Sequence, residues 1–183
     1  MISNQNEMAR ARSMRGLLYL LNQELGLHPS LNEAMRRILQ LSMESVKAES
    51  GSLILLNECG EISHAVRVYA GKIKALPTDK MHAVVREGLA NWVIENRQAA
   101  LISNTRNDPR WLRQTWDDRP KAVRSAVCVP LIYANRVLGV LTLVKRQTAG
   151  FSSSDLALLS ALAFCVSSTS IRAAMYPDPS GWQ

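Results

Sequence analysis

Hydrophobic positions along this chain fall into short strand-like runs and longer helical faces. Two apolar runs at 126–133 and 137–144 are rich in Val, Leu and Ile, and a polar break at 135–136 separates them. Such runs suit a half-buried pleated sheet, so the pair predicts a β-hairpin. Pro130 cannot donate to a ladder and therefore marks a bulge or an open edge. Gly139 leaves room for a bulge or for the close approach of another backbone.

The same kind of pattern predicts further elements on both sides of the hairpin. Ser30 is a good N-cap, and Glu33 completes a capping box that opens a helix. A long polar connection at 103–124 precedes the hairpin, and such loops inside compact domains are usually functional. The predicted helices cover 5–26, 31–47, 89–96 and 153 to about 174, and the other predicted strands cover 52–57, 62–70 and 99–102.

The first predicted helix carries an apolar seam. Its apolar residues follow a spacing of alternately three and four positions, which is typical of a coiled coil. They are Ala11, Met14, Leu18, Leu21 and Leu25. Packing of this helix against its own domain is an equally good interpretation of the spacing, so both stay open.

Composition narrows the class of protein. The chain has 183 residues, which suits one domain with extensions, and 47% of them are hydrophobic, which allows a real core. No secretory signal and no bilayer-spanning run is visible, so we expect a soluble, cytoplasmic protein. Cys59, Cys128 and Cys165 form no C-x-x-C pair, which disfavours structural zinc and a dithiol motif. The net charge of +7 permits an anionic ligand, nucleic acid or a membrane surface without proving any of them.

Six short segments follow one another in a recognisable order and spacing. They are Ser52-Leu-Ile-Leu-Leu-Asn57, Glu87-Gly-Leu-Ala-Asn-Trp-Val93, Asn107-Asp-Pro109, Ser125-x-x-x-Val-Pro-Leu131, Leu138-Gly-Val-Leu-Thr-Leu143 and Phe151-x-x-x-Asp155-Leu156. Together they resemble the GAF domain, a family of small-molecule sensors related in architecture to PAS domains. The resemblance covers residues 30–174. It leaves residues 1–29 as an amphipathic signalling or dimerisation helix and residues 175–183 as a tail or linker.

The resemblance implies an α+β fold with a central antiparallel sheet of five to six strands. It also implies that the N- and C-terminal helices share one face of the sheet. A ligand cavity would lie on the other face, under the mid-chain helix and the long loop. GAF domains commonly dimerise through their end helices. Here that interface would involve Met14, Leu18, Leu21 and Leu25 of the first helix and Leu159, Leu162 and Val166 of the last.

The motif of cyclic-nucleotide GAF domains is matched only in part. Those members carry Asn-Lys after the last strand, then Phe, then Asp-Glu. This chain has Lys145-Arg146, Phe151 and Asp155, so a cyclic nucleotide stays a candidate with an incomplete motif. Arg146 and Asp155 could form an ion pair that ties the loop to the last helix.

Other cofactors and chemistries of the family are disfavoured by the residues present. A bilin needs a thiol near the cavity, often followed by His, and no cysteine here precedes a histidine. Haem would require a pocket histidine, whereas His28, His64 and His82 are lone histidines in loop-like or strand-edge contexts. No spacing suggests an iron site. Members that reduce free methionine sulfoxide use paired cysteines, and Cys59 and Cys128 lie on separate segments.

Candidate ligand-binding residues come from strand alternation and from the roof of the cavity. Alternation selects Ser52, Ile54, Ser125, Val127 and Thr142 as the floor. The roof would offer Trp92, Thr105, Arg106, Trp111 and Arg124. Cations and indoles in the long loop could hold an anionic or planar ligand by charge-assisted hydrogen bonds and stacking. The alternative is that these charges face water and the tryptophans close the core.

We therefore expect a non-catalytic sensory or regulatory GAF domain that binds an unidentified small molecule. It would form a homodimer and signal to a kinase, cyclase or DNA-binding output module, with no direct contact to nucleic acid or membrane. No catalytic residue and no metal site is expected. The alternatives are a ligand-free dimerisation scaffold and a redox enzyme of the methionine sulfoxide reductase type.

Overall fold

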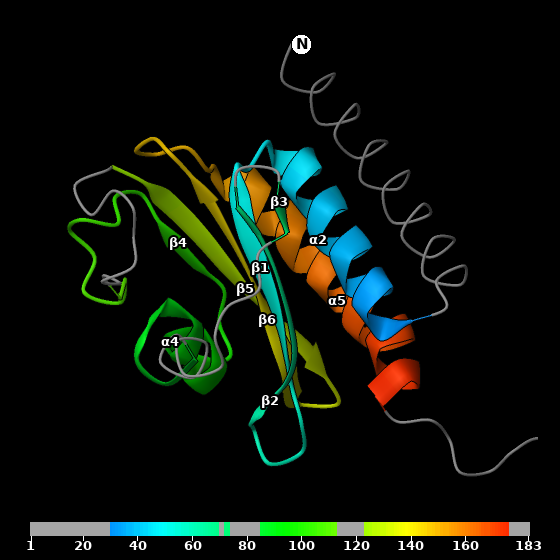
Figure 1. Ribbon diagram of the computed structural model, residues 1–183. Coiled ribbons are helices and arrows are strands. Elements are labelled where there is room, and N and C mark those ends of the chain that lie inside the picture. Colours follow the sequence, from blue (N-terminus) through cyan, green and yellow to red (C-terminus); the bar gives the residue numbers. More distant parts are fainter. Residues whose placement is uncertain (1–29, 70–71, 74–84, 113–122, 176–183) are drawn as a thin grey trace, which may run out of the picture.

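The computed structural model consists of an antiparallel sheet with helices on both faces (Figure 1). It describes residues 30–69, 72–73, 85–112 and 123–175, so the helix predicted at 5–26 and the tail lie outside the described residues. Helices α2 (Leu31–Val46) and α5 (Ser153–Met175) cover one face, called here the helix face. Helix α4 (Leu89–Asn96) covers the other, called the α4 face. The expected α+β fold is confirmed.

The sheet has six strands in the order β3-β2-β1-β6-β5-β4. The strands are β1 (Ser50–Leu56), β2 (Ile62–Tyr69), β3 (Lys72–Ile73), β4 (Ala100–Ile102), β5 (Ser125–Tyr133) and β6 (Arg136–Lys145). The central strands β1 and β6 thus come from the first and last thirds of the described chain. The two-residue strand β3 was missed because it is too short to show any alternation.

Helix α2 begins and ends as its sequence predicts. The Ser30 hydroxyl accepts a hydrogen bond from the Glu33 amide at 3.3 Å, which satisfies one of the unpaired N–H groups of the first turn. Lys47 follows the last turn in the left-handed conformation, with φ of 55°, and its N–H bonds back to the carbonyls of Glu44 and Met43. The helix therefore stops before β1, with one apolar face turned to the sheet.

The hairpin of β5 and β6 contains one extra residue. Ala134 and Asn135 form the turn, both with positive φ, one position earlier than predicted. Pairing starts with Tyr133 opposite Arg136, but the register shifts between Leu131 and Ile132, so that Leu131 lies opposite Gly139. This is a β-bulge on β6. A Cβ on Gly139 would come 2.2 Å from the Ile54 carbonyl oxygen, so both interpretations of this glycine are confirmed.

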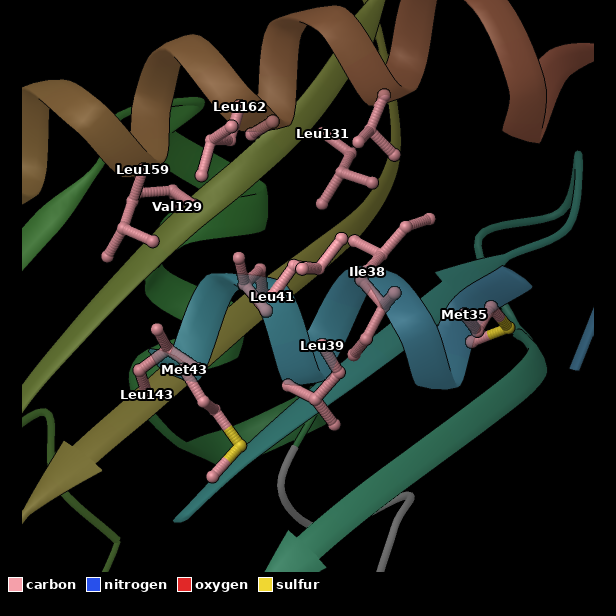
Figure 2. Packing of buried hydrophobic residues seen from close by; sticks show 14 of the residues in the cluster. Met35, Ile38, Leu39, Leu41, Met43, Val129, Leu131, Leu143, Leu159 and Leu162 are labelled. Atoms are coloured by element: carbon pink, nitrogen blue, oxygen red, sulfur yellow. The ribbon is translucent and has the colours of Figure 1, made fainter. Parts of the chain in front are cut away.

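The larger core cluster lies between the sheet and the two long helices. Figure 2 shows Val129, Leu131 and Leu143 of the sheet together with Leu39 of α2 and Leu159 of α5, among other members. Six of its side chains are completely buried, at 0% exposure: Met35, Leu39, Leu53, Leu55, Leu143 and Leu159. Burial of this order is worth about 1.5 to 3 kcal/mol for each large side chain, so the cluster is the main source of stability.

The expected dimer residues of the last helix belong to this core instead. Leu159, Leu162 and Val166 are 0%, 1% and 2% exposed and pack in the cluster under α5. They cannot also contact a partner, so their assignment to a dimer interface is wrong. Leu159, Leu162 and Val166 follow one another at spacings of three and four positions because α5 buries a stripe against its own sheet. Met14, Leu18, Leu21 and Leu25 lie outside the described residues.

Candidate functional site

The α4 face has a core cluster of its own. Its buried members come from α4, from the segment before it and from four strands: Ile54, Leu56, Val85, Leu89, Ala90, Val93, Ala100, Ile102, Ala126, Cys128 and Val140. Trp92 and Trp111 are half-buried and pack against it. Helix α4 lies over β5 and β6. This face therefore combines an apolar floor with aromatic cover from two segments that are separate in the sequence.

Ser52, Ile54 and Thr142 lie on this face as expected. Ile54 is buried in the α4-face cluster. Ser52 pairs with Thr142 across the two central strands, β1 and β6. Both are half-buried, although their strand neighbours on the opposite face, Leu53 and Leu143, are fully buried. Solvent therefore reaches two hydroxyl-bearing residues in the middle of the sheet.

Ser125 and Val127 point to the opposite face, so their placement with Ser52 and Thr142 was wrong. Val127 is 1% exposed and belongs to the helix-face cluster. Ser125 is fully buried, and its hydroxyl accepts a hydrogen bond from the Gly150 amide at 3.1 Å, which fixes the loop before α5. The bulge is the physical reason. Without its extra residue Thr142 would pair with Val127, whereas the shifted register pairs Thr142 with Cys128.

Cys128 is therefore a floor residue that sequence analysis did not select. It is fully buried, and the Thr142 hydroxyl donates to its Sγ at 3.2 Å. Burial raises the pKa of the Cys128 thiol to about 12, and the bond from Thr142 offsets only part of that rise. The thiol is protonated at neutral pH. Because the thiolate is the nucleophile in sulfoxide and disulfide chemistry, Cys128 is an inert packing residue here.

The first part of the long loop lies against α4. Asp108 and Arg110 form a bidentate pair, with Nε–Oδ1 at 2.9 Å and Nη2–Oδ2 at 2.7 Å. The same Arg110 guanidinium lies over the Trp92 ring, 4.7 Å from its centroid. The hydrogen bond from Arg110, opposed by desolvation, holds the pKa of Asp108 below its usual value. This segment, 103–112, is thus tied to α4 by one arginine.

The other expected roof residues divide between buried and exposed positions. Thr105 is 4% exposed, and its amide donates to the Arg124 carbonyl at 2.9 Å, which brings the two ends of the long loop together. Arg124 is half-buried. Arg106 is exposed, with its amide bonded to the Asn104 side chain at 3.0 Å. Its side chain lies at the surface. Ligand contacts by these residues stay predictions.

Arg67 is a second residue of this face that sequence analysis missed. It pairs directly with Ser52, and its strand neighbours Val66 and Val68 are buried on the helix face. The guanidinium lies 5.6 Å from the centroid of the Tyr69 ring, two residues along the same face. A signal was present in the sequence, since alternation along this strand places Arg67 on the face opposite to Val66 and Val68.

The described residues contain no candidate metal site. No group of three or more His, Cys, Asp or Glu side chains gathers in the described ranges.

The suggested pair of Arg146 with Asp155 does not form. Arg146 instead pairs with Glu49, Nε–Oε2 at 3.4 Å, and Asp155 exchanges hydrogen bonds with Ser152 as a capping box for α5. Of the residues shared with the cyclic-nucleotide motif, Asp155 is therefore a helix cap.

A family model for the GAF domain matches residues 28–168. The chain belongs to the GAF domain family. The match spans most of the chain and includes both faces of the sheet, α4 and the long loop. GAF domains are typically sensory or regulatory parts of signalling proteins, and no curated protein matches this chain significantly. Among the described helices, none is both long and apolar enough to cross a membrane.

Solved structures with the same fold include GAF domains and free methionine-R-sulfoxide reductases. The GAF domain of a phosphoenolpyruvate-protein phosphotransferase from Coxiella burnetii has 18% identity and a TM-score of 0.68, and the match covers 89% of this chain and 95% of that chain. A free methionine-R-sulfoxide reductase from Neisseria meningitidis, in complex with its substrate, has 14% identity and a TM-score of 0.66, with 92% and 93% coverage. A GAF domain from A. aeolicus in an inactive state has 16% identity and a TM-score of 0.59, with 85% and 93% coverage. These likenesses show a shared fold.

Proposed function

We propose that this GAF domain is a non-catalytic receptor for a small molecule that binds on the α4 face of the sheet. One observation carries the proposal: Ser52 and Thr142 are partly accessible to solvent although they lie on the two central strands. On the helix face, Leu53, Leu55, Leu141 and Leu143 of the same strands are buried. Accessible hydroxyls beside an apolar floor are what a small-molecule site requires, because a few polar groups orient a ligand in a mostly apolar setting.

The segment 103–112 supports a role as part of a lid. Trp111 packs against the apolar cluster of this face, and Arg110 ties the segment to Trp92 of α4. A ligand on the floor would contact the sheet and this cover at once. Binding would then favour the arrangement in which the cover is closed, and it would bias the position of α5 through the shared sheet. The output would be a kinase, cyclase or DNA-binding module.

The proposal includes a homodimer that uses the outer side of α5 in place of its buried stripe. Phe164 is 68% exposed and is the one exposed large hydrophobic residue among the side chains that the structure describes, which in α5 end at Ser167. Ala157 and Ala161 precede it by seven and three positions, and neither is buried. These three residues lie on one side of a helix, opposite Leu162 and Val166. A second copy of the chain would cover this side.

A redox enzyme is a weaker proposal for this chain. An attacking thiol must ionise near neutral pH and reach its substrate. Cys128 has a pKa of about 12 and is fully buried, and Cys59 is exposed in the turn after β1. Turnover of free methionine sulfoxide by the wild-type chain, lost in Cys59→Ser or Cys128→Ser, would replace the receptor proposal with an enzyme.

The receptor proposal is tested by thermal-shift screening of the full chain against a metabolite library that contains cyclic nucleotides and anionic metabolites. A true ligand stabilises by about 2.7 kcal/mol at a hundredfold excess over its Kd. Ser52→Leu should abolish the shift because it fills the accessible space above the floor. Gln40→Leu, which adds the same side chain to the exposed side of α2, should leave it intact. Absence of any hit would favour the ligand-free scaffold.

A further inference from the structure

The connection between β6 and α5, residues 146–152, is hydrogen-bonded to both ends of the long loop. The Ala149 amide donates to the carbonyl of Ser103, the residue directly after β4, at 2.8 Å. The Gly150 amide donates to the hydroxyl of Ser125, the first residue of β5, at 3.1 Å. These two bonds place the connection, called here the β6–α5 loop, against the base of the long loop.

The two ends of the long loop are also bonded to each other. The Thr105 amide donates to the Arg124 carbonyl at 2.9 Å. Segment 103–112, which covers the α4 face, continues from one side of this junction, and β5 continues from the other. The junction is therefore the point about which the cover would move, and the β6–α5 loop is bonded beside it.

The contact between Ser125 and Gly150 is tightly packed. Ser125 is fully buried. A Cβ on Gly150 would lie 2.8 Å from Ser125 Oγ and 2.9 Å from Lys145 Cδ, closer than real Cβ contacts come. Dense packing of this kind has low compressibility, so a displacement on one side of the contact is passed on to the other side.

The β6–α5 loop is held equally firmly to the beginning of α5. The Lys145 ammonium donates to the Gly150 carbonyl at 2.6 Å and lies 4.5 Å from the centroid of the Phe151 ring. Phe151 is 5% exposed and belongs to the helix-face cluster. The next residue, Ser152, exchanges hydrogen bonds with Asp155 as the cap of α5. The residue that contacts Ser125 is thus two positions from the cap of the helix.

We propose that the contact between Ser125 and Gly150 is a relay that couples the position of segment 103–112 to the beginning of α5. The relay rests on the proposed receptor function and specifies how a signal leaves the α4 face. A ligand that moves the cover would displace the junction, then the β6–α5 loop, and then the cap of α5. Ser125 is a positioning residue in this scheme, because it acts through Gly150.

The relay is tested from the helix side, because coupling between two sites is reciprocal. Ser152→Ala removes the cap of α5 and should increase opening of its first turn. Hydrogen exchange is measured by NMR at single amides of the full chain without any ligand. Exchange at the Thr105 amide, on the far side of the relay, should quicken roughly two- to five-fold.

The same measurement is repeated in backgrounds that break the relay. Ser125→Ala removes the acceptor for the Gly150 amide, and the effect of Ser152→Ala on exchange at Thr105 should then disappear. Gly150→Ala should also abolish the effect, because its Cβ forces the loop away from Ser125. This second variant decides the matter if Ser125→Ala does not fold.

Ser167→Ala is the matched control background. Ser167 is also a fully buried serine that bonds to β5, but its hydroxyl donates to the Ile132 carbonyl at 2.7 Å, near the other end of that strand. The effect of Ser152→Ala on exchange at Thr105 should persist in this background. A loss of the effect here as well would indicate general loosening of α5 and would overturn the relay.

Two further results would overturn the relay. One is unchanged exchange at Thr105 in Ser152→Ala, and the other is an effect that survives both Ser125→Ala and Gly150→Ala. Because no ligand is added, each of these results leaves the receptor proposal standing, with the sheet as the route to α5. The receptor proposal fails separately, if the metabolite screen yields no ligand.

Discussion

The Arg110 guanidinium joins two segments by lying over the Trp92 ring at 4.7 Å while it holds both oxygens of Asp108. Asp108 also accepts from the Arg110 amide at 3.0 Å, which shapes the turn that presents the arginine. The tether is therefore a local turn, an ion pair and a cation–π contact formed by three side chains. It links the beginning of the long loop to α4.

Arg110→Ala should loosen the segment 103–112 and leave the domain folded. The change removes an ion pair and a cation–π contact, each worth about 0.5 to 1 kcal/mol. Hydrogen exchange of the amides in this segment should quicken roughly five- to thirty-fold, with no change in the strands. Arg86→Ala, an exposed arginine just before α4, is the control. Unchanged exchange in the Arg110 variant would show that the tether does not hold the loop.

The same tether should resist acid down to low pH. Arg110 lowers the pKa of Asp108 below the ordinary 3.8. The ion pair therefore contributes fully to the stability of the tether at any pH above that value. The contribution is lost only as the pH falls through the lower, folded-state pKa. Exchange in 103–112, corrected for its intrinsic pH dependence, should be constant from pH 7 to pH 5. A loosening within that range would contradict the assignment.

Two buried serines should respond in opposite ways to alanine. Ser42 is 1% exposed and its hydroxyl has no hydrogen-bond partner among the described residues, whereas the Ser167 hydroxyl lies 2.7 Å from the Ile132 carbonyl oxygen. Ser42→Ala should raise the free energy of unfolding by about 1 kcal/mol, because it removes an unsatisfied group and favours the helix. Ser167→Ala should lower it by about 1 kcal/mol. Urea unfolding measures both, and a destabilised Ser42→Ala would contradict the first expectation.

The cysteines should differ sharply in reactivity. Cys59 is exposed, and Cys128 is buried with its pKa raised to about 12. At pH 8 a disulfide reagent should modify Cys59 within minutes and reach Cys128 only after denaturation, because burial blocks both ionisation and access. The measurement is made on Cys165→Ser, which leaves these two thiols, with a further Cys59→Ser variant as the control. Rapid modification of Cys128 in the folded protein would reopen the redox alternative.

Substitutions at Phe164 and Leu159 should have different effects, the first on self-association and the second on the stability of the fold. Phe164→Glu should reduce self-association in sedimentation experiments and leave the free energy of unfolding of the monomer nearly unchanged, since the side chain is 68% exposed. Leu159→Ala should cost about 2 to 5 kcal/mol of stability, because it empties a fully buried position. A Phe164→Glu variant with unaltered self-association would place the contact between copies elsewhere or exclude a dimer.

Much of the fold followed from local pattern. The helix at 31–47, the helix at 89–96 and both strands of the hairpin were predicted within a few residues, because their periodicity, caps and turn signals are written in neighbouring positions. The faces of β5 could not be assigned in this way. Ala126, Val127, Cys128 and Val129 are all apolar, so alternation carries no information where a strand is buried on both faces.

The sequence by itself determined the order of the elements other than β3, the GAF resemblance and the hydroxyl-bearing positions Ser52 and Thr142, because period and turn chemistry are local properties. Only the tertiary structure decided which residues share the floor with them. One extra residue in β6 moved Val127 to the helix face and brought Cys128 beside Thr142. Register between strands likewise set Arg67 beside Ser52, and packing of α5 turned a dimer-like stripe into core. Such pairings depend on contacts between residues far apart in the chain, which no local pattern encodes.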